Sequence, residues 1–130
     1  MNTKDKGEVA EALALYRMIQ AGYSVSDPWG DNQRFDFLAE KDGEIQRVQV
    51  KYGEPKDGYI EFRTCSVNLR TQEKEDYKGE ADLFALSCPE RDEVYLMEVE
   101  EAGVSSTRIR FGEPNKASPN INWAEDYRAT

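Results

Sequence analysis

The chain has 130 residues, of which 38% are hydrophobic and 11% aromatic, and its net charge is −9. This length fits one folded domain with little room for a second, and the aromatic content excludes a disordered tail. The charge excludes a surface that is basic throughout, which is what a protein that grips phosphates is expected to have.

Three interpretations of the acidic surface stay open. The partner is not nucleic acid, or the chain works in molar salt, where a Debye length of roughly 3 Å screens its charge from DNA. The second case implies an extreme-halophile origin. In the third, an ordinary acidic surface carries one local basic patch.

Residue types that are absent or rare narrow the chemistry further. The sequence has no histidine, which excludes Ser-His-Asp and Cys-His catalysis, His-ligated zinc and nucleases with a histidine base. Cys65 and Cys88 lack CxxC spacing, so we expect two reduced, packed thiols. No stretch resembles a signal peptide or reaches the length of a membrane span, and we expect a cytoplasmic protein.

Residues 6–21 are predicted to form a helix that ends at Gly22, because apolar residues recur at three- and four-residue steps. Its buried stripe is expected to consist of Val9, Ala12, Leu13, Tyr16 and Ile19. A short strand at 23–26 and a loop at 27–33, rich in turn formers, follow.

A hairpin comes next, with strands at 34–40 and 45–51 around the turn 41–44. Alternation places Phe35, Phe37 and Ala39 on one face of the first strand, and Asp36 on the other. On the return strand, Val48 and Val50 lie opposite Gln49 and Lys51. A loop at 54–58 leads to a strand at 59–64.

Residues 67–80 are polar and are expected to form a short helix or a loop over the sheet. Strands are predicted at 82–88 and 93–99 and an edge strand at 108–111, and Asn122 is a candidate cap for a last helical turn. The order of these elements indicates an α/β fold, with a mixed central sheet covered on at least one face by the first helix.

The hairpin brings three polar side chains together. Gln49 and Lys51 share a strand face, and Asp36 lies on the neighbouring strand. Carboxylate and amide oxygens suit Mg²⁺, and a lysine beside the ion can neutralise charge that develops on a phosphate. This pattern suits metal-dependent phosphodiester hydrolysis; the alternative is an ordinary solvated face.

These elements resemble the PD-(D/E)XK nuclease superfamily. "KGEVAEALALYRMIQAGYSV" is similar to the opening of archaeal Holliday-junction resolvases, and "RFDFLAEKDGEIQRVQVKYG" resembles the branch of group I intron-encoded homing endonucleases, in which QxK replaces ExK. The resemblance is specific over about residues 5–53 and looser beyond them. It implies a restriction-endonuclease-like core over about 5–111 within one domain, 1–130, and a tail at 112–130.

The resemblance also implies roles for particular residues. Asp36 would be the principal metal ligand, Gln49 the second, and the Val50 carbonyl a further one. Lys51 would lie near the attacking water, and Glu11 would be the helix acid. Two departures stand out, because Gln49 is neutral and Ala12 replaces the arginine of the resolvases. Periodicity alone leaves Glu8 as an alternative helix acid.

Candidate DNA contacts are more scattered. Trp29 suits either DNA or the end of the core. The most basic run is formed by Lys56, Arg63, Arg70, Lys74 and Lys78. These cations can follow a phosphate backbone, although interleaved glutamates, Glu54, Glu61, Glu73 and Glu75, favour ordinary surface ion pairs. Asp82 is expected to be a structural cap, and Tyr77 and Tyr95 core residues.

The function that these features predict is a Mg²⁺- or Mn²⁺-dependent DNA endonuclease. Double-strand cleavage of the homing or restriction type is the first expectation, and cleavage of Holliday junctions in branched DNA is the second. A catalytically inactive DNA-binding or assembly module on the same scaffold is the third. Cutting both strands requires two sites, so a homodimer or homotetramer is expected.

Overall fold

A computed structural model of the protein describes residues 1–30, 33–67, 70–112 and 120–129. Its helices are α1 (Thr3–Gln20), the 3-10 helix η1 (Pro89–Arg91) and α2 (Ala124–Tyr127). Its strands are β1 (Ser24–Ser26), β2 (Phe37–Lys41), β3 (Glu44–Pro55), β4 (Tyr59–Arg63), β5 (Ser66–Val67), β6 (Lys74–Glu75), β7 (Leu83–Cys88), β8 (Glu93–Glu98) and β9 (Ser106–Arg110).

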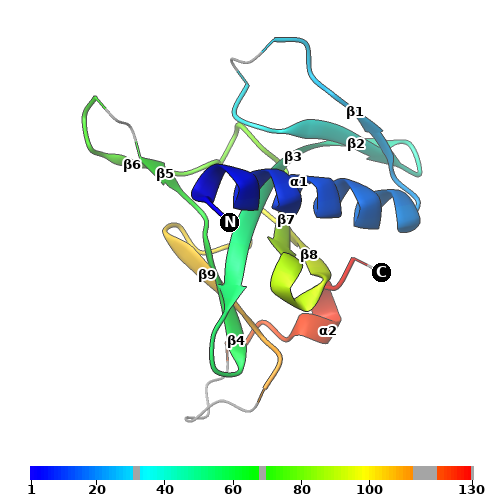
Figure 1. Cartoon of the computed structure of the whole chain (residues 1–130). Helices are drawn as coiled ribbons and strands as arrows, with labels where there is room; N and C mark the ends of the chain where they lie inside the picture. Colours follow the sequence, from blue (N-terminus) through cyan, green and yellow to red (C-terminus); the bar gives the residue numbers. More distant parts are fainter. Residues whose placement is uncertain (31–32, 68–69, 113–119, 130) are drawn as a thin grey trace.

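The main sheet of the described residues has seven strands and is mixed, which confirms the predicted fold class (Figure 1). β3 is the central strand: its first part pairs with β2, its middle pairs in parallel with β7, and its last part pairs with β4. β8 extends the sheet beyond β7, and β9 is an edge strand beside β4, as expected for 108–111. The turn between β2 and β3 has positive φ at Asp42 and Gly43, as the sequence predicted for this hairpin.

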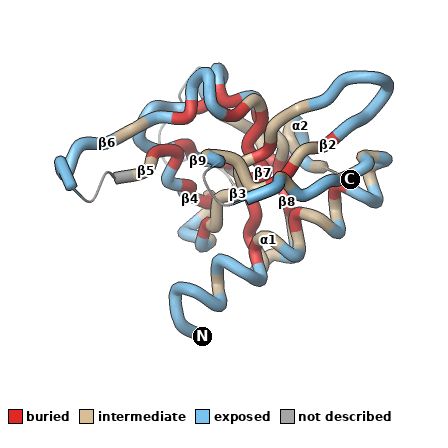
Figure 2. Tube along the Cα trace, turned by 90° about the horizontal axis from the view of Figure 1, so that it is seen from above, coloured by how far each residue is buried: buried red, intermediate tan, exposed pale blue. Residues whose placement is uncertain are grey.

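Helix α1 crosses one face of this sheet, but the stripe that it buries overlaps the predicted one only at Leu13, which packs half-buried against the cluster under the helix. Ala10, Ala14 and Met18 are fully buried, whereas Tyr16 and Ile19 are 56% and 58% exposed. The small alanine side chains let the helix approach the strands closely, and buried positions alternate with exposed ones along α1 (Figure 2). The helix itself ends at Gln20 and Gly22 has a φ of 99°, so Gly22 acts as the expected stop.

Both faces of β7 are covered. All six of its residues are buried, with Leu83 and Ala85 in the cluster under α1 and Phe84 and Leu86 in the cluster on the opposite face. A strand buried on both faces and paired in parallel is expected to be continuously apolar, as this one is. Cys65 and Cys88 are buried free thiols, as predicted.

Several boundaries differ from the sequence prediction. β2 begins at Phe37 rather than at residue 34, and Phe35 packs in the opposite cluster from Phe37 because the chain bends before the strand. β3 continues through Pro55, which shortens the expected loop at 54–58.

Two further predictions concern the segments that follow. Of the two alternatives for 67–80 the loop holds: its described residues form turns and irregular chain around the short β5–β6 pair, and no helix, because Gln72 adopts a positive φ of 62° that a helix excludes. Asn122 does not cap α2: its amide donates to the carbonyl of Arg108, and Trp123 occupies the N-cap position. None of the helices in the described segments is long and apolar enough to span a bilayer.

Candidate active site

The candidate site lies where β2 stops pairing with β3. The backbone N–H of Asp36 donates to the carbonyl of Val48 at 2.7 Å, and the chain then leaves the ladder. The next donor on β3, the N–H of Val50, would be left without a strand partner. The carboxylate of Asp36 accepts this N–H at 2.7 Å, so the side chain completes the end of the ladder. Sheet geometry therefore fixes the position of Asp36.

Beside Asp36 is a cavity of about 270 Å³ between the first turns of α1 and β3. It gathers the polar residues that the sequence singled out as metal ligands. Those residues are Glu11, Asp36, Gln49 and Val50. Glu8, the alternative helix acid, also lines the cavity, as does Lys4. Glu8 is exposed, whereas Glu11 is half-buried.

The two central acids are held under electrostatic strain. Burial raises the pKa of Asp36, although the Val50 N–H and the charge of Lys51 act in the other direction. Burial also raises the pKa of Glu11, and the neighbouring negative charge of Asp36 raises it further. A cation shared by the two carboxylates would favour the ionised form of both.

The amide of Gln49 completes one side of the cavity. Its Nε2 donates to the carbonyl of Val50 at 3.4 Å, so the side chain and this carbonyl lie side by side. A carboxylate at the same position would face the Val50 carbonyl acceptor to acceptor. The neutral side chain therefore suits this position as it stands, while the amide also carries an oxygen that can act as a ligand.

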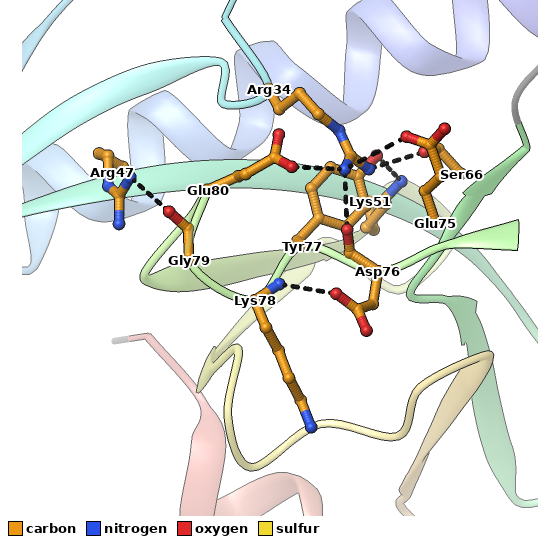
Figure 3. Close-up of polar contacts among 10 residues, drawn as sticks. All are labelled: Arg34, Arg47, Lys51, Ser66, Glu75, Asp76, Tyr77, Lys78, Gly79 and Glu80. Atoms are coloured by element: carbon orange, nitrogen blue, oxygen red, sulfur yellow. Dashed lines mark hydrogen bonds and ion pairs between the residues drawn. The ribbon is translucent and has the colours of Figure 1, made fainter.

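Lys51 lies next to this group but is oriented by another partner. Its ammonium Nζ donates to the hydroxyl of Tyr77 at 2.8 Å and lies 4.4 Å from the centre of the Tyr77 ring (Figure 3). Within the described residues it forms no ion pair with Asp36, although its charge lowers the pKa of that acid. Lys51 is thus close enough to act on the site electrostatically, with its ammonium held to one side.

The donor set fits a hard divalent cation. Two carboxylates, an amide and a backbone carbonyl offer oxygen ligands of the kind that Mg²⁺ and Mn²⁺ prefer. Among the described residues no three Asp, Glu, Cys or His side chains gather as a metal cluster. A cation held here would therefore keep part of its coordination for water or phosphate, which is the usual arrangement for Mg²⁺.

A second hollow adjoins the cavity along the sheet. This groove of about 490 Å³ shares Tyr52 with the cavity, and three of the predicted DNA contacts line it, namely Lys56, Arg63 and Lys74. None of the three forms an ion pair with a described residue. Glu54 and Glu61 also line the groove, but each is ion-paired with a base from outside it, Lys6 or Arg108, and Glu75 is paired with Arg34.

The other predicted DNA contacts lie outside this groove. Trp29 is 98% exposed, so the alternative that it plugs the core is wrong. Arg70 is exposed and does not line the groove, and the side chain of Lys78 points away from the Lys51–Tyr77 pair (Figure 3). The basic run therefore divides into three groove residues and two that lie apart from them.

The structure also adds residues that the sequence did not assign to the site. Tyr77 is buried, as predicted, yet its hydroxyl contacts Lys51, and Arg34 lies over the same ring at 4.2 Å. Asp82 is structural, as expected, because its carboxylate binds the backbone and guanidinium of Arg47 and ties β3 to the start of β7. No periodicity in the sequence indicated the contacts of Tyr77 or Arg34.

A mixed sheet in which an acid ends one strand, a Q-x-K triplet lies on the next, and a helix supplies a second acid defines a restriction-endonuclease-like fold. The chain matches the family model "PD-(D/E)XK endonuclease" over residues 1–130. The protein therefore belongs to the PD-(D/E)XK endonuclease family, and the resemblance inferred from the sequence is confirmed.

A solved structure gives independent support for the same assignment. The chain is similar to a bacterial homing endonuclease, I-Ssp6803I, with a TM-score of 0.68 and 25% sequence identity. The similarity covers 98% of this chain and 87% of that one. Among curated proteins, none matches the chain.

Proposed function

We propose that the protein is a DNA endonuclease that hydrolyses phosphodiester bonds with Mg²⁺ or Mn²⁺. The observation that carries this proposal is the single cavity lined by Glu11, Asp36, Gln49 and Val50 beside Lys51. Membership of the family indicates the class of reaction. The oxygen donors of the cavity indicate a hard divalent cation. The acids of the cavity hold negative charge where the metal would bind.

Different residues of the chain have different roles in such a reaction. Asp36, Glu11, Gln49 and the Val50 carbonyl would hold the cation, which supplies Lewis-acid stabilisation of phosphate and a more acidic water when bound. Lys51 places a positive charge beside the scissile phosphate and stabilises the charge that develops on its oxygens. Asp36 also binds the Val50 N–H, which fixes the carbonyl and amide of β3 in register with it.

Double-strand cleavage of the homing type is the specific activity that we propose. The similar structure is that of a homing endonuclease, and the QxK triplet is present here as Gln49–Lys51. One chain carries one such cavity in the described residues, so cutting both strands requires a homodimer or homotetramer with two-fold symmetry. The DNA would run from the cavity along the groove of Lys56, Arg63 and Lys74.

Cleavage is tested with a plasmid library that carries random inserts, offered with Mg²⁺ or Mn²⁺ at low and at high salt. We expect linear products whose ends share a sequence, and no products in EDTA. Lys51→Met should lower the rate at least about 100-fold, as loss of a transition-state stabiliser does. Lys78→Met removes the same charge from a side chain that points away from the site, and it should cleave at the wild-type rate.

Other outcomes of this test discriminate the alternatives. A four-way junction that is cut while the library stays intact would indicate a junction resolvase instead. An intact library and junction under every metal and salt condition would indicate an inactive binding module. Equal cleavage by Lys51→Met and Lys78→Met would contradict the assigned site.

Replacement of Gln49 by glutamate should tighten binding of Mn²⁺ by about tenfold, because affinity for hard cations rises with the charge of the ligands. Isothermal titration calorimetry in the absence of DNA measures this affinity. Gln46→Glu is the control, since it adds the same charge to β3 outside the lining of the cavity. An unchanged affinity in Gln49→Glu, or an equal gain in both variants, would show that Gln49 is not a ligand.

A triple variant, Lys56→Gln with Arg63→Gln and Lys74→Gln, should bind DNA more weakly and with less dependence on salt. Each phosphate contact contributes about −0.9 to the slope of log affinity against log salt, so loss of all three should reduce the slope by about 2.7. Fluorescence anisotropy of labelled duplex in Ca²⁺ gives the slope. Lys78→Gln serves as the control. A triple variant with the wild-type slope would place the DNA elsewhere.

A further inference from the structure

Tyr77 lies between two cations at the edge of the candidate active site. Its hydroxyl is 2.8 Å from the ammonium of Lys51, and the guanidinium of Arg34 lies 4.2 Å from the centre of its ring (Figure 3). Tyr77 comes from the segment between β6 and β7, 26 residues from Lys51 along the chain. A distant segment of the chain thus reaches the side chain that we place beside the phosphate.

The ring of Tyr77 is firmly held. It is 5% exposed and packs edge-on against Phe84, with the ring centres 5.7 Å apart. Arg34 fixes the surrounding backbone, because its guanidinium donates to the carbonyl of Asp76 at 2.8 Å and to the hydroxyl of Ser66 at 2.7 Å. The phenol oxygen therefore offers a fixed acceptor rather than a mobile one. Arg34 is also two residues before Asp36, so the segment that carries the acid of the cavity also supplies the guanidinium over this ring.

A fixed acceptor is useful to Lys51 because it holds the ammonium in one place. A lysine has four rotatable bonds, and holding its ammonium in one place costs conformational entropy. The partner here is a neutral phenol and not a carboxylate. It takes up one N–H of the ammonium, leaves two for a phosphate, and does not neutralise the positive charge that the phosphate would need.

We propose that Tyr77 is a positioning residue that holds the ammonium of Lys51 beside the Asp36 cavity for phosphodiester cleavage. The proposal rests on the proposed function, and it assigns to the segment between β6 and β7 a part in the site. Tyr77 touches Lys51 and acts through it. The hydroxyl supplies this effect, and the ring supplies the packing.

Tyr77→Phe separates the two parts, because it removes the hydroxyl and keeps the ring. The first measurement needs no enzymatic activity: the amines of the folded protein are acetylated briefly, and mass spectrometry gives the rate at each lysine. We expect Lys51 to react severalfold faster in Tyr77→Phe than in the wild type, with Lys56 unchanged. Tyr16→Phe, which removes an exposed hydroxyl on α1, is the matched control and should leave Lys51 as it is.

The second measurement is the single-turnover rate of cleavage. Tyr77→Phe should lower this rate about 10- to 100-fold, the effect of a misplaced catalytic group, and should change DNA affinity by less than about twofold. In a Lys51→Met background the same substitution should change the residual rate by less than about twofold, because a residue that acts through Lys51 has nothing further to lose.

Each outcome has a separate meaning. An unchanged acetylation rate at Lys51, a wild-type cleavage rate in Tyr77→Phe, or additive losses in the double variant would overturn the positioning role. A wild type that cleaves no DNA, with the acetylation shift present, would overturn the proposed function while the Lys51–Tyr77 contact stands.

Discussion

The Asp36→Asn variant is expected to lose DNA cleavage by about 1000-fold and yet to be at least as stable as the wild type at neutral pH. Asparagine keeps an oxygen that can accept the Val50 N–H, so the end of the β2–β3 ladder stays closed. It removes the charge on which cation binding and stabilisation of the phosphate depend, an effect of the size seen when a single stabilising group is removed.

The stability half of this expectation follows from the direction of the pKa shift. Burial raises the pKa of Asp36 in the folded protein above its ordinary value. Such a group contributes its stabilisation below the unfolded pKa and loses it as the pH rises through the folded pKa. At neutral pH the buried charge therefore disfavours folding, and the neutral asparagine escapes this cost. The advantage of Asp36→Asn should shrink as the pH falls through the raised pKa of Asp36 towards the ordinary carboxyl range.

Urea unfolding at pH 7 and at pH 4, together with single-turnover cleavage, measures both halves. Glu40→Gln is the control, because it neutralises an exposed acid on the same strand, β2. It should leave both the rate and its pH dependence unchanged. An Asp36→Asn protein that cleaves DNA at the wild-type rate, or that is clearly less stable than the wild type at pH 7, would show that Asp36 is a structural cap rather than a ligand.

The part of the site that lies on the hairpin was predictable because local rules determine it. The turn at Asp42 and Gly43 sets the pairing of Phe37 with Val48, and this register brings Asp36 level with Gln49. Alternation along a strand then places Lys51 on the same face. The contact between Lys51 and Tyr77 follows from no such rule, because the path of the chain from β4 to β7 brings Tyr77 to β3.

Helix α1 shows why an apolar pattern can indicate a helix and still assign the wrong face. Apolar residues lie all around α1, and the choice of buried stripe favoured the larger ones, including Val9, Tyr16 and Ile19. The residues buried against the sheet are instead Ala10, Ala14 and Met18, and the two alanines allow the helix to approach closely. Glu11 follows Ala10 on this corrected face, which is why it reaches the cavity. The family register had assigned Glu11 the same role from the sequence.

The acidic composition predicted nothing about where DNA would bind. The net charge of −9 is a sum over the whole chain. The charge of the groove depends instead on three cations and on which bases the nearby glutamates pair with. Glu54 and Glu61 lie close to these cations in the sequence, but each is paired with a base from another element, Lys6 or Arg108. Ion pairs between distant segments are set by the fold, so the sequence alone could not separate the groove from an ordinary charged surface.

The Gly53→Ala variant is expected to lower the free energy of unfolding by about 2–3 kcal/mol, the usual cost of overfilling a packed core. Gly53 is buried on β3, opposite Phe62 on β4. A Cβ at this position would lie 2.5 Å from the ring of Phe62 and 2.8 Å from a methyl group of Ile60. Both neighbours are fully buried, so neither can move away into solvent. Urea unfolding followed by circular dichroism measures the loss.

Two companion variants make this expectation specific to the contact with Phe62. Gly7→Ala adds the same methyl group on α1, where nothing lies within 4 Å, and it should stabilise the protein by about 0.5–1 kcal/mol, because alanine loses less backbone entropy than glycine in a helix. Phe62→Leu shortens the ring that the new Cβ would strike. In the double variant, Gly53→Ala with Phe62→Leu, the loss of free energy of unfolding should therefore be smaller than the sum of the two single losses, by about 1 kcal/mol or more. Additive losses would mean that β3 shifts at Gly53 instead, and such a shift would also displace Lys51, two residues earlier on the same strand.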